Sequence, residues 1–443
     1  MTAEHRRWIG GLTLSLCGLV TGAPLASAQS AAQPAATFAK DVAPILQRSC
    51  QQCHRPGSIA PMSLMTYEDV RPWARSIKAR VSAREMPPWF IDRNIGIQKF
   101  KNDISLSDDE VSTIVSWVDA GSPLGSPKDL PPPAKFPDVT AWQIGTPDLV
   151  VEMPGEQIVK AAAPDWWGDI TTEVAVTEDR YIRAVEVKPL EGYDVVHHAV
   201  ASIVTDDVAA DRAGGTLVEY SMGKNGDIYP DETGRLLPAG AKVSFNLHLH
   251  ATGEQKPAKV AIAFKFYPKG YVPKYRLRAQ LVGGDKETQL DIPAGQDNVR
   301  MDTYATLGAP AVLTQFEAHM HNRGKAMCLE AIYPSGSGNQ RAGGVKTETL
   351  SCVDRFNFGW LRSYTYADDA QPLLPAGTIL HIISWHNNST SNKNNYDSTN
   401  WIGWGNRTID DMAHMWLNYY SVDQKDFDER VAARKARATQ NQQ

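Results

Sequence analysis

The chain changes character at a proline-rich stretch, and this change limits the possible folds more than any other feature of the sequence. Residues 123–144 contain the run Pro131, Pro132 and Pro133, which fits neither a helix interior nor a central strand. Before this stretch apolar residues recur at helical spacing, and after it short alternating runs are separated by Gly, Pro, Asn and Asp. The sequence therefore predicts a small all-α domain followed by antiparallel β-sheet.

The β-like part is too long for one sandwich, because it spans about 290 residues and a single sandwich uses roughly 100 to 150. We expect two all-β antiparallel, jelly-roll-like sandwiches. Seven strand-like runs carry this prediction: 181–187, 195–203, 243–250, 260–267, 275–281, 313–321 and 379–385. The expected organisation is a leader at 1–28, the helical domain at 36–122, the linker at 123–144, sandwiches at 145–288 and 289–425, and a tail at 426–443.

The first 28 residues have the composition of a signal peptide that is removed on export. A basic start at 5–7 precedes an apolar middle at 8–20 and a small-residue cleavage site, Ala-Ser-Ala, at 26–28. A single anchoring helix is the alternative, but glycines interrupt the apolar run. We therefore expect a periplasmic or secreted bacterial protein.

Charge and hydropathy exclude two further classes of protein. The chain carries 50 acidic and 45 basic side chains, a formal net charge of −5, which argues against nucleic-acid binding driven by bulk positive charge. Beyond the leader there is no uncharged apolar run of about 20 residues, so we expect no membrane-spanning helix.

The motif most closely tied to one chemistry is Cys50-Gln51-Gln52-Cys53-His54. Two thiols three residues apart can form thioethers with both vinyl groups of one haem, and the adjacent His54 then becomes an axial ligand of the iron. A thioredoxin-like dithiol is the alternative, but it requires a preceding strand, and here a short helical pattern leads into the motif. We therefore predict one covalently attached haem c.

A second axial ligand is expected downstream of the motif, where Met62, Met65 and Met86 are the candidates. Met86 precedes two prolines, whose fixed backbone favours an extended loop that can present a thioether. The block from the opening helix through the haem motif and the Met-Pro loop to the helix containing Trp117 resembles a small class I cytochrome c. The resemblance implies that Met86 is the distal haem ligand.

Histidines in the β-like part form three close pairs: His197 with His198, His248 with His250, and His319 with His321. Residues i and i+2 of a strand face the same side, so each His-x-His pair can offer two imidazoles to a single ion. The adjacent pair can converge on one metal only where the backbone bulges or the two rings use different nitrogens. Three such pairs in one exported chain indicate metal binding.

Copper is the metal that the remaining residues favour. Outside the haem motif the mature chain keeps only Cys328 and Cys352, and carboxylates do not cluster with these histidines, which argues against zinc-hydrolase and calcium sites. Imidazole combined with a thioether suits copper, because soft sulfur stabilises Cu(I). Met412, in the segment 409–416, stands out as the source of that thioether.

The order His-His, His, His-x-His and Met on two sandwich domains resembles the type II copper monooxygenases, the family of peptidylglycine alpha-hydroxylating and dopamine beta-monooxygenases. The resemblance covers about residues 145–425 and implies two coppers. The ligands of the copper that passes electrons would be His197, His198 and His248. The ligands of the catalytic copper, where O₂ is activated, would be His319, His321 and Met412.

Two of these choices have alternatives. His250 can replace His248, since alternation lets either ring reach the same face. Met415 can replace Met412, although the acidic pair before Met412 matches the family better. The resemblance also places a disulfide in the hairpin region flanked by the two remaining cysteines, at positions 328 and 352.

The chain departs from the peptide-amidating members, which have an Arg and a Tyr where this sequence has Glu317 and Trp416. A glycine-extended peptide is therefore not the expected substrate, and Glu317 could instead pair a cation or a hydroxyl, or be an ordinary strand residue. Trp416, with Trp385, Trp401 and Trp404, could line an apolar pocket.

Together these features predict an exported, haem- and copper-dependent monooxygenase that hydroxylates a C–H bond of a small organic substrate with O₂. A redox protein or small reductant would supply electrons, which would pass from the haem to the first copper and then to the catalytic copper. One alternative is a periplasmic copper and haem electron-transfer or copper-handling protein without oxygenase activity. Another is a ligand-binding sandwich carried on a cytochrome.

Overall fold

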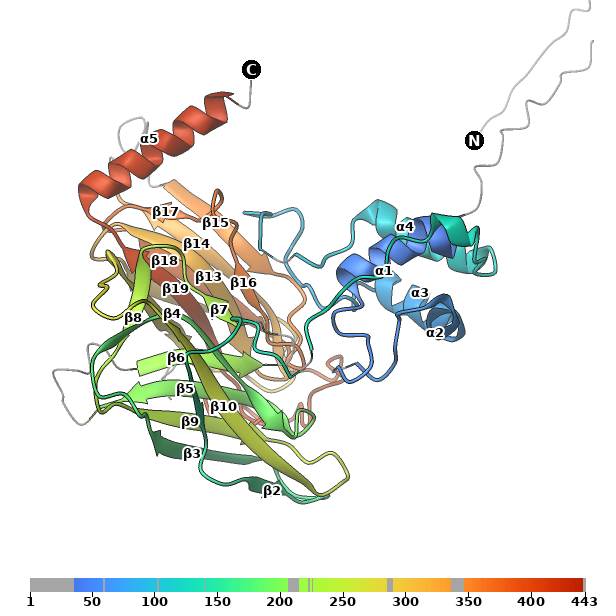
Figure 1. Ribbon diagram of the computed structural model, residues 1–443, viewed down its shortest axis with the longest axis horizontal. Helices are drawn as coiled ribbons and strands as arrows, with labels where there is room; N and C mark the ends of the chain where they lie inside the picture. The colour runs from blue at the N-terminus through green and yellow to red at the C-terminus, as the bar shows by residue number, and fades with distance from the viewer. Residues whose placement is uncertain are drawn as a thin grey trace, which may run out of the picture. The chain divides into compact units, whose positions relative to one another are not determined.

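The computed structural model describes residues 36–440, except positions 59, 102, 139, 206–214, 222, 223, 225, 285–289 and 336–345. The expected leader at 1–28 and the expected boundary between the sandwiches at 288/289 lie outside the described residues. Short helices occupy the N-terminal part, strands fill most of the remainder, and one longer helix ends the chain (Figure 1). The prediction of a largely antiparallel β protein with a few helices is confirmed at this level.

The region before the linker is helical. It contains η1 (Phe38–Val42), α1 (Ala43–Ser49), α2 (Tyr67–Val70), η2 (Arg71–Trp73), α3 (Ala74–Ser82) and α4 (Asp108–Asp119), and η3 (Pro127–Asp129) follows. α4 begins at a capping box, in which Ser107 accepts a hydrogen bond from the backbone N–H of Glu110 and donates its own backbone N–H to the Glu110 carboxylate. Ile114 and Trp117 of α4 are fully buried in a small core of this region.

The strands lie between residues 149 and 421. They are β1 (Leu149–Glu152), β2 (Gln157–Val159), β3 (Trp166–Glu173), β4 (Arg180–Glu191), β5 (Val196–Val204), β6 (Gly215–Ser221), β7 (Asp227–Ile228), β8 (Thr233–Leu237), β9 (Lys242–Leu249), β10 (Lys256–Phe266), β11 (Tyr275–Gly284), β12 (Val299–Thr306), β13 (Ala311–Met320), β14 (Gly324–Tyr333), β15 (Lys346–Val353), β16 (Ser363–Thr365), β17 (Leu373–Leu374), β18 (Ile379–His386) and β19 (Ala413–Ser421). All seven strand-like runs of the sequence overlap strands of the structure, namely β4, β5, β9, β10, β11, β13 and β18.

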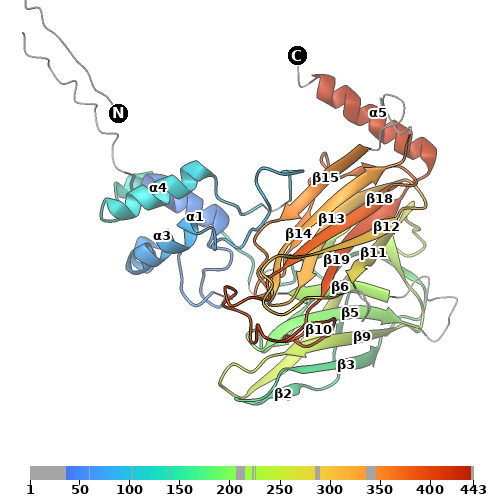
Figure 2. The ribbon, with the colours of Figure 1, turned by 180° about the vertical axis from the view of Figure 1, so that it is seen from behind.

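These strands form three sheets. The largest has eleven strands in the order β1-β10-β4-β8-β11-β19-β13-β16, with β2, β7 and β17 paired beside this path. The other two have four strands each, in the orders β3-β9-β5-β6 and β12-β18-β14-β15. A short parallel pairing of β8 with β11 joins the two halves of the large sheet, so both halves belong to one hydrogen-bonded sheet. β8 is labelled near β4 in Figure 1, and β11 near β19 in Figure 2.

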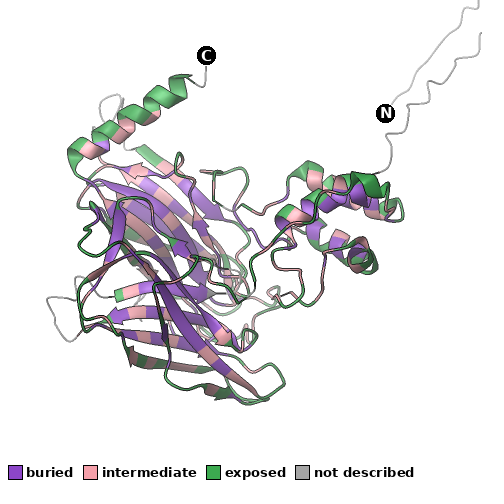
Figure 3. Ribbon diagram, in the orientation of Figure 1, coloured by how far each residue is buried: buried purple, intermediate pink, exposed green. Residues whose placement is uncertain are grey.

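Each four-stranded sheet packs against its own half of the large sheet. Ile262 of β10 and Phe245 of β9 belong to one buried cluster, and Phe316 of β13 and Leu329 of β14 belong to another. Buried residues are concentrated on the inner strands of the sheets, whereas the edge strands β3 and β12 have none (Figure 3). The two layers of each sandwich are therefore held together by burial of apolar side chains.

The extended segment 89–101 packs with the second sandwich although it precedes the linker. Trp89, Phe90 and Ile91 are buried in the same cluster as the residues of β13 and β14. Ile91 forms a bridge with Val353, and the Ile97 N–H donates to the carbonyl of Leu350. Part of the range expected to form the helical domain therefore contributes to the core of the sandwich.

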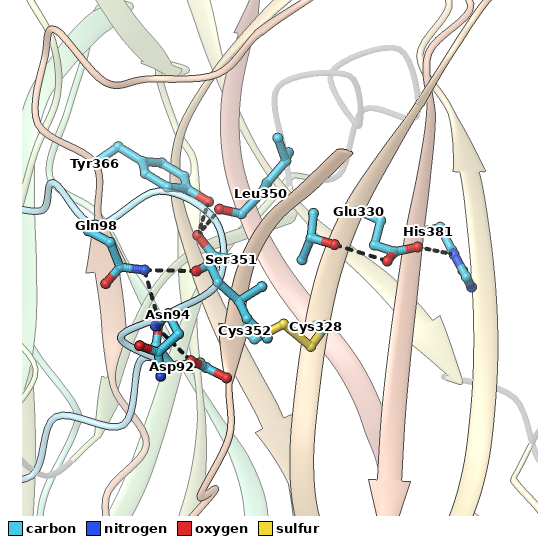
Figure 4. Close-up of a disulfide and its surroundings, with 12 residues drawn as sticks. Asp92, Asn94, Gln98, Cys328, Glu330, Leu350, Ser351, Cys352, Tyr366 and His381 are labelled. Carbon is cyan, nitrogen blue, oxygen red and sulfur yellow. Dashed lines mark hydrogen bonds and ion pairs between the residues drawn. A yellow bond between two sulfur atoms is a disulfide. The ribbon is translucent and has the colours of Figure 1, made fainter. Parts of the chain in front are cut away.

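A disulfide joins Cys328 of β14 to Cys352 of β15, as the family resemblance implied, and the segment 92–98 lies beside it (Figure 4). The terminal helix α5 (Gln424–Gln440) buries only Phe427. Within the described part of the chain, no helix has both the length and the apolar character needed to cross a membrane.

Candidate metal centres

The first histidine set, defined as His197, His198 and His248, comes together where β5 pairs with β9. His198 lies opposite His248 in the antiparallel ladder, and the register shifts between Val196 and His198. This irregularity brings Nδ1 of His197 to 3.3 Å from Nδ1 of His198, although adjacent strand residues normally face opposite sides. One ring nitrogen from each of the three histidines lies within 4.8 Å of the others.

The geometry of the first set fits a metal ion. Two nitrogens bound tetrahedrally at about 2.0 Å from one ion lie about 3.3 Å apart, which is the distance between the Nδ1 atoms of His197 and His198. His248 donates its Nε2–H to Asp165 at 3.0 Å, and its buried Nδ1 has no hydrogen-bond partner. An imidazole held by a carboxylate through one nitrogen, with the other nitrogen free, is the usual state of a metal-bound histidine.

Burial keeps these rings neutral, which is the form that binds metals. Burial, assisted by neighbouring imidazoles, lowers the pKa of His197 to about 3 and that of His198 well below its usual value. Burial also lowers the pKa of His248 to about 4, against the opposing effect of Asp165. The structure places His250 differently, because its side chain is 57% exposed and its Nδ1–H donates to Asp165 at 2.7 Å.

The second set, defined as His319, His321 and Met412, lies where β13 and β19 meet. His321 donates its Nδ1–H to the carbonyl of Asp410 at 3.2 Å, which leaves Nε2 for a ligand. His319 is buried, and its Nδ1 has no hydrogen-bond partner. Burial lowers the pKa of both imidazoles, so this set also presents neutral rings.

Asp411 fixes the backbone around the second set. This fully buried carboxylate accepts hydrogen bonds from the N–H groups of His321 at 2.8 Å, Arg323 at 3.1 Å and Met412 at 2.8 Å. It therefore ties the end of β13 to the residue that begins the approach to β19, and the acidic pair noted in the sequence has a structural role.

One cavity is lined by His198 of the first set and by all three residues of the second set. A space of about 230 Å³ is lined by Trp167, His198, Val200, Glu219, Asn246, His319, His321, Asn406, Met412, His414 and Trp416. The ring centroids of His198 and His319 are 6.0 Å apart. The ring of Phe358 contacts His197 at 4.5 Å and His321 at 5.1 Å between centroids, so it lies between the two sets.

The structure adds His414 to the residues that the sequence singled out around the cavity. His414 lies opposite His319 in the ladder, and the two rings stack with centroids 4.5 Å apart and planes 7° apart. Burial lowers the pKa of His414 to about 3, and its Nδ1 has no hydrogen-bond partner. Strand alternation from Met412 is the signal that could have identified it. Met415, the alternative ligand, is buried in the apolar core of the second sandwich.

Glu317 lies behind the cavity and contacts a hydroxyl, since Ser363 donates to its carboxylate. The neighbouring Glu219 is buried, and one of its oxygens lies 3.9 Å from Nδ1 of His319. One ligand atom each of Glu219, Glu317 and His319 lies within 4.8 Å of the others. The expectation that carboxylates do not cluster with these histidines is therefore wrong, because β6 and β13 bring residues together that are distant in the sequence. Burial, together with repulsion from Glu317, raises the pKa of Glu219 well above its usual value.

Of the four tryptophans considered for a pocket, only Trp416 is among the residues lining the 230 Å³ cavity.

The haem motif forms a tight turn after α1. Cys50 and Cys53 are free thiols, and His54 donates its Nδ1–H to the carbonyl of Met62 at 3.2 Å, leaving Nε2 available to iron. Burial raises the pKa of Cys50 to about 12, whereas reactive dithiols have lowered values. These features fit thioether attachment better than a thioredoxin-like dithiol.

Met86 lies in the loop that follows α3. It lines a small cavity of about 20 Å³ with Trp89, Ile91, Arg355 and others, and none of the three motif residues is among them. Met62 packs against the helical core, and its carbonyl accepts the hydrogen bond from His54. The choice of Met86 as the distal ligand stays a prediction.

Comparisons with known proteins do not identify the chain. No family model matches it, and no curated protein matches it. Among solved structures it is similar to the VP2 subviral particle of infectious bursal disease virus, with 11% identity, 65% of this chain and 74% of that chain covered, and a TM-score of 0.20. It is also similar to N-glycanase F, with 11% identity, 62% and 96% covered, and a TM-score of 0.26. Similarities this weak carry no argument about fold or function.

Proposed function

We propose that this chain is an exported haem- and copper-dependent monooxygenase that hydroxylates a C–H bond of a small organic substrate. The observation that carries the proposal is the common cavity, into which neutral imidazoles from both sandwiches and the thioether residue Met412 converge. The overall reaction would be R–H + O₂ + 2e⁻ + 2H⁺ → R–OH + H₂O. The disulfide supports an oxidising compartment.

In this proposal the first histidine set and the second set each hold one copper, which would supply one-electron chemistry and the activation of O₂. Unpartnered ring nitrogens in both sets support this assignment, because buried polar atoms normally have partners. Asp165 supports ligation by His248, because it accepts a hydrogen bond from Nε2 as outer-shell carboxylates do in metal sites and leaves Nδ1 free.

The volume and lining of the cavity limit the size and polarity of the substrate. Its volume of about 230 Å³ is below the roughly 300–1,000 Å³ of pockets for drug-sized ligands, which favours a compact molecule. Trp167, Val200 and Trp416 contribute apolar surface that would exclude water around the reacting bond.

The N-terminal part would act as a class I cytochrome c domain at 36–122, with haem held by Cys50, Cys53 and His54, and Met86 as distal ligand. The loop between β15 and β16 contacts both the N-terminal part and the histidine sets, so it supports the proposed transfer of electrons from the haem to the copper sites. Arg355 in this loop donates to the carbonyl of Ala83, and Phe358 contacts both histidine sets.

A second function has one specific observation in its favour. If His414 joins His319, His321 and Met412 as a fourth donor, the second metal would have no open position for O₂. A closed site of this kind favours the alternative of a periplasmic electron-transfer or copper-handling protein.

Two variants separate these functions. The assay incubates the reduced, purified protein with a pool of cell metabolites under labelled O₂ and measures label in the products. His319→Ala and Met412→Ala should keep the haem absorption spectrum but incorporate no labelled oxygen. His381→Gln is the matched control, because both ring nitrogens of His381 are hydrogen-bonded: Nδ1 to Glu330 (Figure 4) and Nε2 to Asp302. If both the His319→Ala and the Met412→Ala protein still incorporate labelled oxygen, the assignment of the second set as the catalytic copper site is refuted. A native protein that binds copper but incorporates no oxygen would favour the alternative.

A further inference from the structure

Asp165, which precedes β3, is the point where hydrogen bonds from both sandwiches meet. Its carboxylate accepts from His248 Nε2 at 3.0 Å and from His250 Nδ1 at 2.7 Å. It also accepts from the hydroxyl of Thr408 at 2.6 Å, although Thr408 lies 243 positions away in the sequence. One side chain therefore contacts a member of the first histidine set and a residue just before Met412.

The segment that contains Thr408 is hydrogen-bonded to Asp411, the residue that holds the backbone of the second set. The N–H of Gly405 donates to the carbonyl of Asp411 at 3.1 Å, and Asp411 in turn anchors the backbone of His321 and Met412. Thr408 is almost fully buried. A displacement of Thr408 would therefore shift the backbone that presents the second set.

The orientation of His248 depends on the same carboxylate. Trp167 stacks on its ring, with centroids 4.3 Å apart and planes 18° apart, but stacking does not determine which nitrogen faces the other histidines. The hydrogen bond from Nε2 to Asp165 does, because it directs the unpartnered Nδ1 away from the carboxylate.

We propose that Asp165 is a positioning residue for both metal sites: it orients His248 in the first histidine set and, through Thr408, fixes the segment that presents His321 and Met412. This inference rests on the proposed copper binding, not on oxygenase activity. It predicts that one outer-shell carboxylate controls metal affinity in two sites built from different sandwiches.

The test measures Cu(I) affinity, by competition with a chromogenic chelator, in full-length protein that retains its haem. The His321→Ala background isolates the first site, and the His197→Ala background isolates the second. Asp165→Asn should lower affinity about 10- to 100-fold at the first site, the usual effect of losing an outer-shell partner, and measurably at the second. Thr408→Val should lower affinity at the second site only, and Thr408→Ser should restore it.

His250→Gln is the matched control, because it removes another donor to Asp165 without altering His248 or Thr408. It should leave both affinities within a factor of two. Circular dichroism and haem absorption report whether each variant folds, and the Thr408 pair tests the link even if Asp165→Asn does not fold. Three results would overturn the inference. Asp165→Asn could leave Cu(I) affinity at the first site unchanged, or Thr408→Val could leave Cu(I) affinity at the second site unchanged. The third is that neither background binds copper. Copper binding with the predicted pattern but without oxygen incorporation would leave it standing while the proposed function fails.

Discussion

Acidification should destabilise the copper-free protein through the imidazoles around the cavity. Burial lowers the pKa values of His197 and His414 to about 3 and that of His248 to about 4. In the unfolded chain these groups would titrate near 6.5. The unfolded state therefore binds more protons below that pH, so the stability present above about pH 6.5 is lost as the pH falls toward the folded pKa values.

The loss can be estimated for one ring. Consider an imidazole that has a pKa of about 6.5 in the unfolded chain and stays neutral in the folded protein. When the pH falls from 7 to 5, this one ring lowers the free energy of unfolding by about 2 kcal/mol. Three such rings would cost about 6 kcal/mol, an amount comparable to the whole stability of many domains. Glu219 acts in the opposite direction because its pKa is raised, so a comparison between variants is a sharper test than the absolute loss.

The assay is urea unfolding of copper-free protein at pH 7 and pH 5, followed by circular dichroism. His414→Gln removes one of these rings and should reduce the difference between the two pH values by about 2 kcal/mol. His250→Gln, at a half-exposed position outside the first histidine set, should leave the difference unchanged. Equal pH dependence in the native protein and His414→Gln would refute the reasoning that His414 is held neutral by burial.

Three variants test the packing of the second sandwich and its site. Trp89→Ala removes an indole whose ring centroid lies 5.1 Å from that of Tyr364, and it should lower the free energy of unfolding by about 3–5 kcal/mol in urea denaturation while the haem spectrum is retained. Asp411→Ala leaves three backbone N–H groups without their acceptor; the expected cost is at least about 3 kcal/mol, with loss of copper from the second site in metal analysis. Replacing both Cys328 and Cys352 by Ser opens a loop with a sequence separation of 24, which should cost about 3.5 kcal/mol by the chain-entropy estimate. A change below 1 kcal/mol in any of the three would contradict the packing described for that residue.

Local patterns in the sequence were sufficient for the features that depend on near neighbours. The strand-like run 313–321 predicted β13 and the His-x-His pair at its end, and the run 379–385 predicted β18. The rule that adjacent histidines need a bulge to converge is met by the register shift beside His198. Each of these depends on backbone geometry within a few residues.

Features that depend on distant segments could not be predicted in this way. Asp165 is 83 positions from His248 and 243 from Thr408, and no local pattern marks a hydrogen bond over such a separation. Trp89 and its two apolar neighbours suited a haem loop as well as a sandwich core, because hydrophobicity does not specify which core a side chain joins. The continuous large sheet likewise depends on the pairing of β8 with β11, two strands far apart in sequence.

The central claim is that imidazoles from both sandwiches hold two redox-active ions beside a covalently attached haem. Determination of iron and copper per chain after exhaustive dialysis, in the native protein and in His197→Ala and His319→Ala, tests it most directly. We predict one iron and two coppers in the native protein, and one iron with about one copper in each variant, since each substitution removes one ligand of a separate site. A native protein that contains iron but no copper, or variants that retain both coppers, would contradict the account.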